Sequence, residues 1–118
     1  VVDDMRTNLE VMRGILDNIY NLTLCKSGYQ AIQYMKKNPF PDLIIMDVDM
    51  PEMTGIEATV KINEITGGTV PVLFVTAICD TQTVITCREL HAAGYIVRPY
   101  KPVYIKSEIE RILSGWRH

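Results

Sequence analysis

Two carboxylates, Asp47 and Asp49, follow an apolar run in the stretch LIIMDVDMPEMTG at residues 43–55. The run is continuous rather than alternating, which is typical of a strand covered on both faces in a parallel sheet. Acidic side chains are seldom placed beside a core unless they are paired or hold a cation. The first question is therefore which positive charge these acids meet.

Polar side chains also follow other apolar runs that we expect to be strands: Asp3 and Asp4 after VV, Thr76 in VPVLFVTA, and Arg98 after YIV. In open parallel sheets, ligands bind at the carboxyl ends of the strands, at the point where the strand order reverses. We therefore expect these side chains to share one edge of a sheet with Asp47.

Three or four carboxylates at one edge repel one another unless a cation lies among them. Oxygen ligands of this kind suit Mg²⁺, which takes one or two carboxylates, keeps several waters and leaves positions for phosphate oxygens. Solvated loop acids are the alternative, and it stays open for Asp49 alone. The joint placement of Asp3, Asp4 and Asp47 favours a Mg²⁺ site.

The elements that would position these residues alternate between short apolar runs and helical spacing. Strands are expected at 1–2, 20–24, 43–46, 70–77 and 95–98, and helices at 7–18, 28–37, from Gly55 to the Gly67-Gly68 pair, 81–93 and 102–113. Ser27 is a suitable N-cap and the glycine pair a suitable helix end. The helix at 81–93 is rich in β-branched residues, which disfavour helix.

Five strands alternating with five helices require parallel pairing through right-handed crossovers, and hence helices on both faces of one sheet. The predicted fold class is α/β: a (βα)5 doubly wound, flavodoxin-like fold with a five-stranded parallel sheet. Residues 1–118 are expected to form a single domain in which the start of the first strand is missing. Any effector domain would lie outside this chain.

Apolar spacing also predicts which side chains face the core. The helix at 7–18 carries one apolar stripe, alternation orients the strand at 20–24, and the helix at 102–113 has its own buried side. The side chains expected inward are Leu9, Met12, Ile15, Leu16 and Ile19; Tyr20, Leu22 and Leu24; and Ile105, Ile109, Ile112 and Leu113.

Composition limits the function classes. The chain has 118 residues, a 47% hydrophobic fraction and a net charge of −2, so it offers no general attraction for nucleic acid or an anionic membrane. No apolar run approaches the roughly 20 residues of a membrane helix. The three cysteines lack CxxC spacing and indicate idle thiols in a reduced compartment, so a cytoplasmic location is expected.

Four motifs together resemble the receiver domain of two-component response regulators over the whole chain: VVDD, MDVDMPEMTG, FVTA, and a basic residue followed by proline. The resemblance implies that Asp47 accepts a phosphoryl group from a histidine kinase or phosphotransfer protein. It also implies that Asp47 and Asp4 ligate Mg²⁺, that Asp3 acts through water or by orienting the site, and that the backbone carbonyl of Asp49 completes the ligands.

The same resemblance implies a signalling module rather than an enzyme, one that assists its own phosphorylation and dephosphorylation. Thr76 would move its hydroxyl onto the phosphoryl group, Ala77 would leave space for it, and Tyr95 would follow this movement. The surface formed by 81–93, 95–98 and 102–113 would then change. Its readers would be an effector domain or downstream protein, and a homodimer through this surface is a further hypothesis.

The basic position departs from the family, which places a lysine there. Arg98 before Pro99 and Lys101 before Pro102 are the two candidates, and Arg98 is preferred because Lys101 would put Pro99 inside the strand. An arginine offers a planar fork rather than a compact ammonium, so phosphoryl contact is expected to change or to be shared with Lys101. The resemblance also implies a cis Arg98-Pro99 bond.

Two other functions remain as alternatives. A receiver that binds partners without phosphorylation is favoured only by Arg98. The DVD motif is also similar to that of haloacid dehalogenase-type phosphatases, in which Asp47 would be the nucleophile and Asp49 a general acid and base. Such enzymes carry the motif on their first strand and need a longer chain, which argues against this reading.

Overall fold

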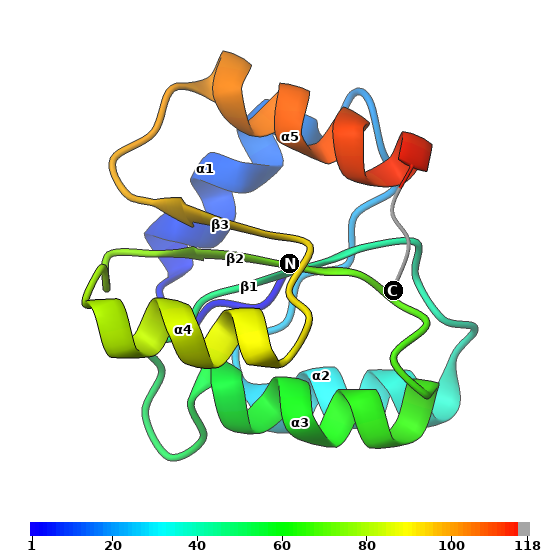
Figure 1. The fold of residues 1–118 in the computed structure, drawn as a ribbon. Coiled ribbons are helices and arrows are strands. Elements are labelled where there is room, and N and C mark those ends of the chain that lie inside the picture. Colours follow the sequence, from blue (N-terminus) through cyan, green and yellow to red (C-terminus); the bar gives the residue numbers. More distant parts are fainter. Residues whose placement is uncertain (116–118) are drawn as a thin grey trace.

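The computed structural model describes residues 1–115 and contains five helices around a parallel sheet (Figure 1). The elements follow one another as α1 (Arg6–Leu16), α2 (Gly28–Lys37), β1 (Ile44–Met46), α3 (Gly55–Thr66), β2 (Val72–Thr76), α4 (Thr81–Glu89), β3 (Gly94–Val97) and α5 (Pro102–Gly115). The alternation of strands and helices confirms the predicted α/β class.

The sheet has the parallel order β1-β2-β3, with Ile44 opposite Val72 and Leu73 opposite Gly94. Single parallel bridges join Val2 to both Cys25 and Met46, so the first expected strand lies between β1 and the segment at Cys25, in the order expected for a doubly wound sheet. Within residues 1–115 these two segments form bridges rather than regular strands, which corrects the prediction of five.

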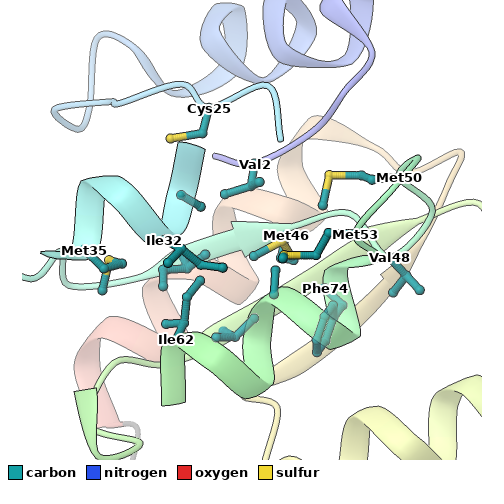
Figure 2. Close-up of a cluster of buried hydrophobic side chains, with 14 of the residues drawn as sticks. Val2, Cys25, Ile32, Met35, Met46, Val48, Met50, Met53, Ile62 and Phe74 are labelled. Atoms are coloured by element: carbon teal, nitrogen blue, oxygen red, sulfur yellow. The ribbon is translucent and has the colours of Figure 1, made fainter. Parts of the chain in front are cut away.

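Two hydrophobic layers enclose the sheet. α1 and α5 cover one face, and α2, α3 and α4 cover the other (Figure 1). Figure 2 shows the second layer, in which Ile32 and Met35 of α2 and Ile62 of α3 pack against Met46 and Phe74 of the sheet. Both sides of the strands are therefore buried, as the continuous apolar run of β1 predicts.

Caps fix the ends of the helices that flank the site. The Ser27 hydroxyl accepts from the Gln30 N–H, so α2 begins where the sequence predicted. Thr54 and Glu57 form a capping box at the start of α3, and Gly67 ends that helix with a φ of 67°. These caps set where the loop after β1 joins α3.

The ends of two other helices differ from the prediction. α1 stops at Leu16, so Ile19 lies beyond the helix and is 49% exposed rather than inward. α4 stops at Glu89 instead of residue 93, and His91 has a φ of 61°, which no helix accommodates. Hydrophobic spacing persists past the point where the chain turns, and both helices were therefore predicted too long.

The predicted inward positions were partly wrong elsewhere. Between α1 and α2, Tyr20 and Leu22 are half-buried and pack against the layer that α1 and α5 form, as predicted. Leu24 is half-buried but belongs to neither layer, and the buried residue beside it is Cys25, which pairs with Val2. On α5, Leu113 is 41% exposed whereas Ile109 is buried. Among residues 1–115, no helix combines the length and apolar character needed to cross a membrane.

Candidate functional site

Three acids meet at the carboxyl edge of the sheet. Asp3 and Asp4 follow the bridge at Val2, and Asp47 follows β1. The backbone N–H of Asp47 donates to the Val2 carbonyl at 3.0 Å, which joins the two segments. One carboxylate oxygen from each acid lies within 4.8 Å of the others. Asp3 is 2% exposed and Asp47 5%, so their charges are poorly screened by water. The structure thus brings together the acids that the sequence placed at one edge.

Arg98 supplies positive charge to this cluster. Its Nη2 donates to Asp3 Oδ2 at 2.7 Å, and its Nη1 lies 3.6 Å from Asp47 Oδ2. The backbone holds the arginine there, since the Arg98 N–H donates to the Thr76 carbonyl at 2.9 Å. The Arg98-Pro99 bond is cis, as the resemblance implied. This double contact with two acids is a feature that the sequence did not reveal.

Lys101, the other candidate for the basic position, lies outside the acid cluster. Its side chain is exposed, and in the part of the chain that the structure describes it makes no ion pair. Its backbone carbonyl instead accepts from residues of the first turn of α5. Of the two basic residues, Arg98 is the one that contacts the acids.

The acids differ in how well their oxygens are satisfied. Asp3 Oδ1 accepts from the Met5 N–H at 2.9 Å, and its other oxygen pairs with Arg98. Asp4 Oδ1 is buried and has no hydrogen-bond partner. A buried carboxylate oxygen without a partner is costly, and a hard cation beside it removes that cost. The residues present therefore fit a Mg²⁺ ion between Asp4 and Asp47.

Several influences act on the protonation of Asp47. Burial raises its pKa above the ordinary range, and the negative charge of Asp3 acts in the same direction. The Thr76 hydroxyl, the Asp49 N–H at 3.2 Å and the Arg98 charge all lower that pKa. The net pKa is raised, so the site disfavours an ionised Asp47 unless more positive charge is supplied.

Thr76 and Ala77 lie where β2 ends. Thr76 is fully buried, and its hydroxyl oxygen accepts from the Ile78 N–H at 3.3 Å. Ala77 beside it is exposed and has only a methyl group, so it occupies little of the space in front of Thr76. The hydroxyl thus lowers the pKa of Asp47 and also accepts a hydrogen bond from the loop that leads into α4.

Tyr95 lies on β3 and reaches the same loop. Its hydroxyl donates to the Ile78 carbonyl at 2.6 Å, and its ring lies 6.2 Å from that of Phe74, tilted by 40°. Burial is the main cause that raises the pKa of Tyr95 to about 12, so the phenol stays protonated at neutral pH. The resemblance linked Tyr95 to Thr76 but did not show that both residues bond to Ile78.

The loop after β1 positions Asp47 and Asp49. The Asp49 side chain is exposed, and its backbone N–H holds Asp47 Oδ1. Gly55 donates to the Val48 carbonyl at 2.9 Å, and a Cβ on Gly55 would lie 2.0 Å from the Asp47 carbonyl oxygen. Only glycine permits this approach. The sequence pattern indicates Gly55 only as the start of a helix and gives no sign of this role.

A cavity of about 600 Å³ lies apart from the acids. It lies between the segments near Tyr20 and Leu43, and it is lined mainly by apolar side chains such as Met35 and Phe40. Neither Asp3 nor Asp47 lines it. The candidate site is therefore an open edge of the sheet rather than this cavity.

A family model described as response regulator receiver domain matches residues 1–110. The chain is 31% identical over 115 residues to the transcriptional regulatory protein ZraR of Escherichia coli K12, covering 97% of this chain and 26% of that protein. It is 43% identical over 65 residues to the signal transduction histidine-protein kinase BarA of Escherichia coli K12, covering 54% of this chain and 7% of that protein. The chain thus spans about a quarter or less of the length of these curated relatives.

Solved structures agree with this match. The signal receiver domain of a histidine kinase from Syntrophus aciditrophicus has a TM-score of 0.84 and 31% identity, covering 99% of this chain and 89% of that one. A CheY-like receiver domain protein from Methanospirillum hungatei JF-1 has a TM-score of 0.88, covering 96% of this chain and 90% of that one. At 23% identity, the second likeness supports the fold alone.

Proposed function

The chain belongs to the response regulator receiver domain family, and we propose on this premise that it takes a phosphoryl group onto Asp47. The donor would be the phosphohistidine of a histidine kinase or of a phosphotransfer protein. The observation that carries the proposal is the cluster itself: a buried carboxylate 3.6 Å from a guanidinium and beside an acid, Asp4, whose buried oxygen has no partner.

The transfer exchanges one bond to phosphorus for another. A lone pair on an Asp47 oxygen attacks phosphorus while the bond from phosphorus to the histidine nitrogen breaks, and the imidazole leaves with that electron pair. The product is an acyl phosphate on Asp47. Catalysis of such a step consists mostly of positioning and charge neutralisation. When bound, Mg²⁺ would offset negative charge on both the acids and the phosphoryl oxygens.

The residues of this chain would bind the cation, orient the acceptor and contact the phosphoryl group. Asp4 and Asp47 would hold the cation together with the backbone carbonyl of Asp49, and Asp3 would orient the site. The Asp49 N–H, 3.2 Å from Asp47 Oδ1, keeps the carboxylate in place. Arg98 and the Thr76 hydroxyl would then contact phosphoryl oxygens, because both already lie next to Asp47.

The readout would begin at Ile78. Thr76 accepts from its N–H and Tyr95 donates to its carbonyl, so a Thr76 hydroxyl that turned toward a phosphoryl group would weaken the first bond directly and would affect the second through Ile78. The change would reach the surface of α4, β3 and α5, where Val97 and Tyr104 are exposed apolar residues. An effector domain, a downstream protein or a second copy of the chain would read this surface.

Intact mass tests the proposal directly. The domain is incubated with acetyl phosphate and Mg²⁺, beside an Asp47→Asn variant and a sample that contains a chelator. One added phosphoryl group is expected in the wild type only, while Asp49→Asn, which changes an exposed acid of the same loop, should still be labelled. Labelling of Asp47→Asn, or none of the wild type, would reject Asp47 as the acceptor.

One observation favours a second candidate, a receiver that binds partners without phosphorylation. Arg98 itself offsets part of the negative charge on Asp3 and Asp47, so the unmodified site already contains a cation of its own. The mass experiment separates the two candidates. The haloacid dehalogenase alternative has lost its support, because residues 1–110 match a receiver model and the Asp49 side chain is exposed.

A further inference from the structure

Arg98 spans two acids in a way that a single ammonium does not. Nη2 lies 2.7 Å from Asp3 Oδ2 while Nη1 lies 3.6 Å from Asp47 Oδ2, so the two ends of one guanidinium meet two carboxylates. The arginine side chain is 21% exposed and both partners are buried. A planar, rigid fork suits this arrangement, whereas a lysine would offer one point charge.

This contact changes what Asp3 can offer to a cation. Its Oδ1 accepts from the Met5 N–H and its Oδ2 accepts from Arg98, so both oxygens already have partners. Asp4 is the opposite case, because its Oδ1 is buried and has none. The opening for a cation therefore lies on the side of Asp4 and Asp47, away from Asp3.

We propose that Arg98 is an internal counter-cation of the acid cluster, which weakens the affinity of the site for Mg²⁺. A resident positive charge that contacts two of the three acids repels a second cation and occupies oxygens that the metal would otherwise use. The inference rests on the proposed cation of the site, but not on phosphoryl transfer.

Calorimetric titration with Mg²⁺ alone tests this role, using the wild type, Arg98→Gln and Arg88→Gln. The last variant removes an exposed arginine of α4, so it matches the change in net charge. Loss of the guanidinium should tighten Mg²⁺ binding by about tenfold or more at low salt, and Arg88→Gln should change it by less than about twofold. Equal or weaker binding by Arg98→Gln would overturn the inference.

Two further measurements keep the proposal falsifiable if Arg98→Gln folds poorly. Arg98→Lys retains the charge but not the fork, so its Mg²⁺ affinity should lie between those of the wild type and Arg98→Gln; binding weaker than that of the wild type would contradict the proposal. In chelator, Arg98→Gln should unfold at a lower urea concentration than the wild type, and saturating Mg²⁺ should remove that difference. A deficit that persists in Mg²⁺ would assign Arg98 a purely structural role.

The result is independent of the phosphorylation experiment. Acetyl phosphate could fail to label Asp47 while Arg98→Gln still tightened Mg²⁺ binding, and the inference would then stand without the proposed function. The absence of Mg²⁺ binding by the wild type and the variants alike would overturn the inference, whether or not acetyl phosphate labels Asp47.

Discussion

Asp47→Asn should make the metal-free domain more stable, although it removes the proposed acceptor. Asn is close in size to Asp, and its oxygen can still accept from the Asp49 N–H that now bonds Oδ1. The substitution therefore removes a charge and little else. Its effect on the free energy of unfolding reports the electrostatic cost of an ionised Asp47.

The magnitude follows from the distances. The carboxylate oxygens lie within 4.8 Å of one another, and at that upper limit, with an effective dielectric constant of about 20, an ionised Asp3 or Asp4 each opposes a charge on Asp47 by about 3.5 kcal/mol. Arg98, at 3.6 Å, offsets about 4.6 kcal/mol of this repulsion. The balance is about 2 kcal/mol against the charged carboxylate, and we expect Asp47→Asn to raise the free energy of unfolding by about 1–2 kcal/mol.

The pH dependence of unfolding provides a second test of the sign of this stability difference. Burial raises the pKa of Asp47 in the folded state above its unfolded value of about 4. The wild type therefore loses stability as the pH rises through the raised pKa, and the variant does not. The advantage of Asp47→Asn should be complete above the raised pKa and should vanish as the pH falls toward about 4.

Urea unfolding followed by circular dichroism, in chelator and at several pH values, measures this difference. Asp49→Asn is the matched control, because that acid is exposed on the same loop, and it should change stability by less than about 0.5 kcal/mol. Added Mg²⁺ should erase the advantage of Asp47→Asn by stabilising the wild type. An Asp47→Asn variant no more stable than the wild type in chelator would refute the reasoning.

Two other substitutions test how the site is built. Tyr95→Phe removes the hydroxyl that donates to the Ile78 carbonyl and should lower the free energy of unfolding by about 1 kcal/mol in urea; an unchanged midpoint would show that this bond contributes nothing. Gly55→Ala places a methyl group against the Asp47 carbonyl and should cost about 1–3 kcal/mol and slow labelling by acetyl phosphate. Its control, Gly14→Ala on an open helix surface, should be neutral or stabilising, and equal effects of the two would contradict the close approach at Gly55.

The parts of the fold that local chemistry determines could be predicted from the sequence. Ser27 caps α2 and Gly67 ends α3 through bonds within a few residues, and the expected boundaries agree with the structure. The ends of α1 and α4 depend instead on where the chain leaves the core. Apolar spacing continues past both ends, so it assigned Ile19 to a buried stripe that stops at Leu16.

The candidate site, like the fold, could be predicted from the sequence only in part. The acids could be placed together because the edge of a parallel sheet collects the residues that follow its strands. The partners of their individual oxygens depend on side-chain geometry across the sheet. Arg98 is 95 positions from Asp3 in the sequence, and no local pattern shows that its fork reaches both Asp3 and Asp47. The unpartnered oxygen of Asp4 is visible only in three dimensions for the same reason.

The central claim is that Asp47 is the residue that carries the phosphoryl group, and locating the modification tests it most directly. The domain is labelled with acetyl phosphate and Mg²⁺, and the acyl phosphate is reduced with borohydride, which converts the modified aspartate to homoserine. Peptide mass spectrometry then identifies its position. We expect homoserine at position 47 alone; homoserine at position 3, 4 or 49, with position 47 unchanged, would contradict the account.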